Sequence, residues 1–111
     1  MIELTIKKYL DGHLDVPSFL ERQANMPDKF VLYEKTGGGK RNHLQTATFA
    51  FQSYAPSLYQ AAELNEILKN VVEGMVILPE IISVELNSDY NFTDTTTKEY
   101  RYQAVYDIKY Y

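Results

Sequence analysis

Histidine is the residue type of this chain best suited to acid–base or metal chemistry, and it occurs only twice, at His13 and His43. Neither histidine has another histidine or an acid three or four residues away, the spacing that brings metal ligands together on a helix. The chain has no cysteine, which excludes disulfides, thiolate metal sites and a cysteine nucleophile. No hydroxyl, amine or carboxylate stands beside a candidate base in a catalytic pattern. We therefore expect no catalytic residue, no metal site and no cofactor, and predict that the protein is not an enzyme.

Three glycines followed by two cations, in EKTGGGKR at residues 34–41, partly match a phosphate-binding loop. Such a loop has an opening glycine, a Ser or Thr after its lysine, and a helix beyond it. Here Arg41 follows Lys40, no glycine opens the pattern, and a strand is expected next. We interpret the segment as a flexible hairpin turn with a basic tip, and expect no nucleotide binding. The tip either is merely solvated or meets an acidic neighbour.

The segment NSDYNFTDTTTKE, residues 87–99, is acidic and rich in threonine. Asp89 and Asn91 begin an EF-hand spacing, but the later positions depart from it and no glycine is present. We interpret the segment as a solvated acidic loop or a long hairpin arm. Its charge is opposite to that of the basic tip, so the two segments either steer neighbouring subunits together or never meet and only keep the protein in solution. The candidate interface residues are Gly37, Gly38, Gly39, Lys40, Arg41, Asp89, Tyr90, Asn91, Phe92 and Asp94.

The composition is typical of one folded domain. Of the 111 residues, 45% are hydrophobic and 23% are charged, and we expect a single domain over residues 1–111. A net charge of −4 disfavours nucleic-acid binding. No apolar run is long enough to span a membrane and no secretion signal is evident, so we expect a protein made and used in soluble form. Ten tyrosines suit either one face of a sheet or surfaces that become buried in assembly.

Hydrophobic spacing predicts two helices. The first covers residues 2–10 and is expected to end before Gly12, in the left-handed position that follows many helices. The second covers residues 57–73, with Ser57 in a capping pattern and Gly74 at its end. The residues expected to face the sheet are Leu64, Leu68 and Val71.

The remaining regular segments predict strands, the first of them a short edge strand. Their ranges are 14–21, 30–36, 44–54, 81–86 and 100–110. The glycine run is expected to stop the second of these strands, with a hairpin across residues 37–42. The last strand alternates strictly, with tyrosines on one face. Together these elements predict an α+β fold, a four- to five-stranded mostly antiparallel sheet with two helices packed on one face.

Several stretches taken together resemble a family of small tail proteins from long-tailed phages and prophages of Gram-positive bacteria. The stretches are Val16-Pro17, FVLYEKTGGG at 30–39, FQSYAPSLYQAAELNE at 51–66, LNSDYNFTD at 86–94 and YRYQAVYDI at 100–108. Members are described as tail terminator, tail completion or minor capsid proteins. The resemblance covers nearly the whole chain.

The resemblance implies a structural subunit of the virion tail or neck, present in the host cytoplasm during assembly. Subunits of this kind form a ring, commonly a hexamer, that caps the tail tube and joins it to the head connector. The implied partners are further copies of the chain, the major tail tube protein and head–tail connector proteins, without nucleic-acid specificity or a membrane. The alternatives are a minor capsid or neck adaptor acting as a monomeric assembly factor, and a small enzyme with a cryptic acid or tyrosine site.

Overall fold

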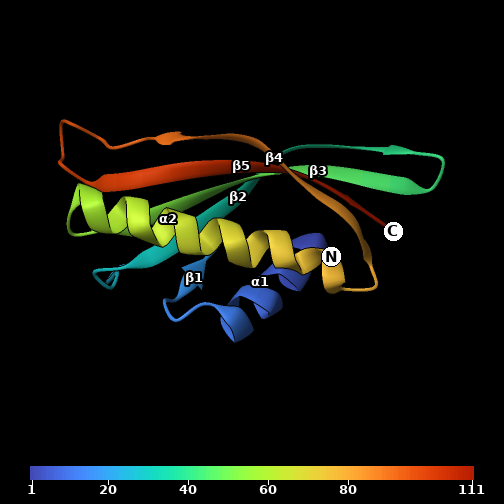
Figure 1. The fold of residues 1–111 in the computed structure, drawn as a ribbon, viewed down its shortest axis with the longest axis horizontal. Helices are drawn as coiled ribbons and strands as arrows, with labels where there is room; N and C mark the ends of the chain where they lie inside the picture. The colour runs from blue at the N-terminus through green and yellow to red at the C-terminus, as the bar shows by residue number, and fades with distance from the viewer.

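One layer of the structure is a five-stranded sheet, and two helices pack against it as a second layer (Figure 1). The computed structural model describes residues 1–111. The elements in chain order are α1 (Ile2–His13), β1 (Ser18–Phe19), β2 (Phe30–Arg41), β3 (Leu44–Ala55), α2 (Leu58–Glu73), the short 3-10 helix η1 (Gly74–Ile77), β4 (Ile81–Asn91) and β5 (Tyr100–Tyr110). The strand order is β1-β2-β3-β5-β4. Only the β1–β2 pair is parallel, so the α+β fold with a mostly antiparallel sheet is confirmed.

The core lies between the sheet and the two helices. Alternate residues of the central strands point into it, and because side chains of a strand alternate between its faces, the same strands present polar residues on the side away from the helices. The largest fully buried side chains of the strands are Tyr33, Phe49, Phe51 and Tyr106. The alternation expected for β5 is confirmed from Ala104 onward, with Ala104, Tyr106, Ile108 and Tyr110 buried, whereas Tyr100 and Tyr102 are half-buried and Gln103 on the other face is buried too.

Helix α2 begins as its capping pattern predicts, because the Ser57 hydroxyl accepts a hydrogen bond of 3.2 Å from the Gln60 backbone N–H. Leu64 and Leu68 are buried as expected. Val72 completes the four-residue spacing of this face and is fully buried, whereas Val71 packs only at its margin. The last residue of the predicted contact face was therefore wrong, because Val72 rather than Val71 is buried in the core.

Helix α1 is longer than expected. It runs through Gly12 to His13, and no glycine of the chain has a positive φ. The ring of His13 stacks on that of Tyr9 with 4.0 Å between centroids, and its Nδ1 lies 2.7 Å from the Tyr9 carbonyl oxygen. These contacts stabilise the helix beyond Gly12. The prediction that the helix ends before a left-handed glycine at position 12 was therefore wrong.

The glycine run does not end strand β2. Gly37, Gly38 and Gly39 are strand residues that pair with Thr48, Ala47 and Thr46 of β3, after a bulge between Lys35 and Gly37. A Cβ on Gly38 would lie 2.9 Å from Lys35 Cε and 3.0 Å from the Thr46 carbonyl oxygen, which explains a glycine there. The hairpin is confirmed, but its turn is narrower than predicted.

The turn of this hairpin consists of Asn42 and His43, with φ of 52° and 68°. Positive φ at both positions is what a type I′ turn requires, and the twist of this turn matches that of the strands. The turn residues, rather than the glycines, therefore reverse the chain.

Two other strand boundaries differ from the predictions. The edge strand at 14–21 shrinks to Ser18–Phe19. Strand β4 continues past residue 86 to Asn91, so β4 and β5 form the long hairpin arm that the polar segment allowed. Cross-strand pairing with β5 holds this arm, and local propensity does not report such pairing.

Candidate interaction surfaces

The basic tip predicted from the sequence lies at one end of the sheet. Lys40 and Arg41 close strand β2 beside the Asn42–His43 turn and are exposed, as are Gly37, Gly38 and Gly39. Neither cation takes part in any ion pair of the structure. The tip therefore presents two unneutralised charges on a narrow hairpin.

The acidic segment does not behave as one solvated loop. Asp89 lies on β4 and accepts hydrogen bonds from Asn65 Nδ2 at 2.7 Å and Lys69 Nζ at 2.6 Å, both on α2. Asp94 instead accepts hydrogen bonds from the backbone N–H groups of Thr96 and Thr97, which hold the pKa of its carboxyl below the ordinary value. Asp89 thus joins the sheet to α2, and Asp94 shapes its own turn.

The aromatic residues of the arm pack on one another and on a cation. The Tyr90 and Phe92 rings meet edge to face at 5.8 Å, and the Arg101 guanidinium lies 4.6 Å from the centre of the Phe92 ring. Asn91 Oδ1 accepts a hydrogen bond of 3.0 Å from the Thr93 N–H. The arm is therefore held by its own contacts.

The structure does not bring the basic tip and the arm together. Leu44, next to the tip, is at one end of β3, and Ala55 at the other end pairs with Tyr100, where the arm returns into β5. In Figure 1 the β2–β3 turn and the β4–β5 turn lie at opposite ends of the long axis of the molecule. Its extents are 44 × 25 × 24 Å. Within one subunit these predicted interface segments cannot touch.

A row of polar side chains crosses the sheet on the face away from the helices, and sequence reasoning missed it. Gln52 Nε2 donates to Gln103 Oε1 at 2.8 Å, the Tyr54 hydroxyl donates to Gln52 Oε1 at 3.1 Å, and Gln103 also bonds the Tyr90 hydroxyl. Arg101 donates to the Tyr54 hydroxyl at 2.8 Å. Because these residues come from three strands, their meeting depends on strand register, which no local spacing in the sequence reveals.

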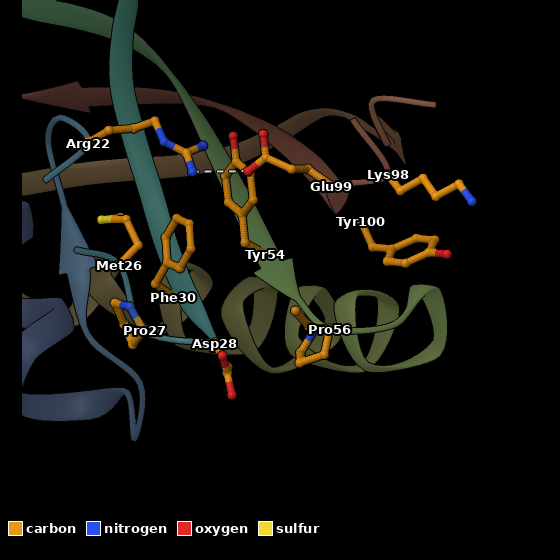
Figure 2. Close-up of a pocket in the computed structure, with 11 residues that line it drawn as sticks. Arg22, Met26, Pro27, Asp28, Phe30, Tyr54, Pro56, Lys98, Glu99 and Tyr100 are labelled. Atoms are coloured by element: carbon orange, nitrogen blue, oxygen red, sulfur yellow. Dashed lines mark hydrogen bonds and ion pairs between the residues drawn. The ribbon is translucent and has the colours of Figure 1, made fainter. Parts of the chain in front are cut away.

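Close to the arm, a hollow of about 320 Å³ is walled by the residue 22–30 segment, β3 and the start of β5 (Figure 2). The rings of Phe30 and Tyr54 stack at 4.5 Å, and the Arg22 guanidinium lies over both. Arg22 also pairs with Glu99 at 2.9 Å, drawn as a dashed line in Figure 2. The Arg22–Glu99 pair thus links the loop to the end of the arm across the hollow.

Two buried tyrosines tie the sheet to the helices. The Tyr33 hydroxyl donates to the Glu3 carbonyl oxygen at 3.1 Å, and the Tyr106 hydroxyl donates to Glu73 Oε2 at 2.5 Å. Burial raises the pKa of both hydroxyls above the ordinary tyrosine value. These groups hold helix ends in place.

The histidines are separated in the structure, His13 at the end of α1 and His43 in the hairpin turn. No group of three or more His, Cys, Asp or Glu side chains is arranged to hold a metal ion. None of the helices combines the length and the apolar character needed to cross a membrane.

The fold and its surfaces define a small α+β domain with a basic hairpin at one end and a bonded aromatic arm at the other. No protein-family model matches the chain, and no curated protein matches its sequence.

Proposed function

We propose that this protein is a structural subunit of a phage or prophage tail, a tail terminator or completion subunit that caps the tail tube and joins it to the head connector. The family resemblance of its sequence segments leads to this proposal. The α+β fold with helices on one face of the sheet agrees with what that resemblance implies.

The observation that carries the proposal is the placement of the exposed basic tip at one end of an elongated subunit, far from the acidic group of Glu63, Glu66 and Asp89. A ring subunit needs two different surfaces, each of which meets the other surface of the next copy. Attraction between the basic tip of one copy and this acidic group of the next favours such a head-to-tail arrangement over stacking of like surfaces.

Unpaired strand edges provide further contact area of the kind a ring uses. Strand β1 pairs only with Val31 and Leu32, which leaves the outer edge of β2 from Tyr33 to Arg41 without a partner strand. Strand β4 forms the opposite edge of the sheet. Such edges pair readily with another chain.

The test is complementation of a phage that lacks the gene, with tail length scored by electron microscopy. Wild-type protein is expected to give tails of uniform length, whereas Lys40→Glu with Arg41→Glu gives irregular, overlong tails while the purified variant stays folded. Lys8→Glu, which reverses an exposed cation on α1, serves as the control and leaves tails normal. Normal tails from the double variant would show that the basic tip is not needed to cap or join the tail tube.

The same experiment distinguishes the proposed tail subunit from the alternative, a monomeric assembly factor. Finished virions that contain the protein support a tail or neck subunit. Virions without it, from a strain that needs it for assembly, would replace the proposal with a monomeric assembly factor.

A further inference from the structure

A pocket between α2 and the β4–β5 hairpin contains an excess of negative charge. It has a volume of about 380 Å³, and its walls include Tyr59, Glu63, Glu66, Asp89 and Tyr102. Three of these residues are carboxylates, and one ammonium, that of Lys69, lies among them at 2.9 Å from Glu66 and 2.6 Å from Asp89. Hydrogen bonds to Asp89 and Glu66 raise the pKa of Lys69, so this ammonium stays charged. Three negative charges against one positive charge leave the pocket at −2.

Two of the three carboxylates, those of Glu63 and Glu66, face solvent. Glu63 takes part in no ion pair of the structure, and Glu66 is 69% exposed. Glu63 and Glu66 lie three residues apart on α2 and therefore on the same side of the helix. Two carboxylates at this spacing are suited to bind a cation that approaches from outside.

Two tyrosines and a buried amide complete the pocket. Tyr59 is 76% exposed, so its ring is open to contact from outside the subunit. Tyr102 lines the pocket from β5. Asn65 is 1% exposed and lines it from α2, and its Oδ1 has no hydrogen-bond donor. Aromatic rings beside carboxylates bind guanidinium and ammonium groups by combined cation–π and ionic attraction.

The chain carries a matching group at its other end. Lys40 and Arg41 are exposed and unpaired, and the preceding glycines and two-residue turn make the hairpin narrow enough to enter an open pocket. Tyr102 pairs with Ser53, and the tip adjoins Leu44 on the same strand. The nine residue steps between them span about 30 Å, so the tip cannot reach the pocket of its own subunit.

We propose that this pocket binds the Lys40–Arg41 tip of a second copy of the chain, with Arg41 between the two tyrosines and against Glu63 and Glu66. The inference rests on the proposed function in that a ring needs such a head-to-tail contact, and it assigns the two surfaces that make it. Glu63 and Glu66 are then the acids that contact the tip; Asp89 adds its charge to the pocket but, like Asp94, is engaged within the subunit.

Disulfide trapping tests the contact, because the chain has no cysteine of its own. Arg41→Cys protein is mixed with Glu63→Cys protein and oxidised at low salt. The control mixes Arg41→Cys with Glu80→Cys, since Glu80 is an exposed acid outside the pocket. The pocket pair is expected to cross-link about tenfold faster than the control pair, and the difference should shrink in high salt.

Equal cross-linking rates for the two pairs would overturn the proposal, since they would show that the pocket does not bind the tip of another copy. A charge exchange gives an independent check. The contact predicts that the chain associates at high concentration and low salt. Lys40→Glu with Arg41→Glu should abolish this association, and adding Glu63→Lys with Glu66→Lys should restore it. Failure of the exchange to restore association, with both variants folded by circular dichroism, also counts against the contact.

A chain carrying both Arg41→Cys and Glu63→Cys separates this inference from the proposed function. A ladder of cross-linked oligomers supports both the contact and a ring. A closed dimer with two disulfides supports the contact and overturns the ring. Rings seen by microscopy without preferential cross-linking keep the proposed function and overturn the contact.

Discussion

Replacing Leu68 by alanine should destabilise the protein strongly. Leu68 is 0% exposed in the middle of α2 and belongs to the cluster that joins both helices to the sheet. Loss of three buried carbons removes their transfer free energy and leaves a cavity that the close-packed core fills only in part. We expect the free energy of unfolding to fall by about 2–5 kcal/mol, the range for buried leucines.

Urea denaturation followed by circular dichroism measures this change, since a domain of this size is expected to unfold in one step. Ile67→Ala is the matched control, because Ile67 is the neighbouring residue on the same helix but is 49% exposed. The control should lose less than about 1 kcal/mol. A loss below about 0.5 kcal/mol for Leu68→Ala, or equal losses for the two variants, would refute the assigned core face.

Three further variants or conditions test other parts of the structure. Asp89→Ala leaves the buried Asn65 amide without its acceptor and should cost about 1–3 kcal/mol in urea denaturation, and an unchanged midpoint would contradict the role of Asp89 as a link between β4 and α2. His43→Gly relieves a side chain held at φ 68° and should raise stability by about 1 kcal/mol, whereas a lower melting temperature would contradict the turn geometry. Because the folded state raises the pKa of Tyr33 and Tyr106, the unfolded chain loses these protons first, so stability should fall as pH rises above about 10, and Tyr33→Phe should reduce the slope of that fall.

The predictable part of the fold consists of elements with a strong local signal. Helix α2 has a capping serine and apolar residues at helical spacing, and β5 alternates between buried and more exposed residues from Ala104 to Tyr110. In both cases the pattern lies within one element, so the residues themselves specify which side is buried.

The boundaries that were wrong depend on partners elsewhere in the chain. Three glycines normally indicate a break, yet Gly37–Gly39 stay in the sheet because β3 supplies partners for them. Strand β4 extends to Asn91 because β5 lies beside it. Intrinsic strand propensity is weak compared with cross-strand pairing, so tertiary context decides these residues.

The sequence alone determined that the protein is an α+β domain with a basic hairpin and with acidic residues elsewhere, because charge and periodicity are read directly from residue order. Only the tertiary structure decided which charges are free. It pairs Asp89 with Lys69 across 20 positions of the chain, and it gathers Glu63 of α2 with Tyr102 of β5 in one pocket, far from the basic tip. These relations depend on strand register and helix packing, since both bring together residues whose separation in the sequence carries no signal of contact.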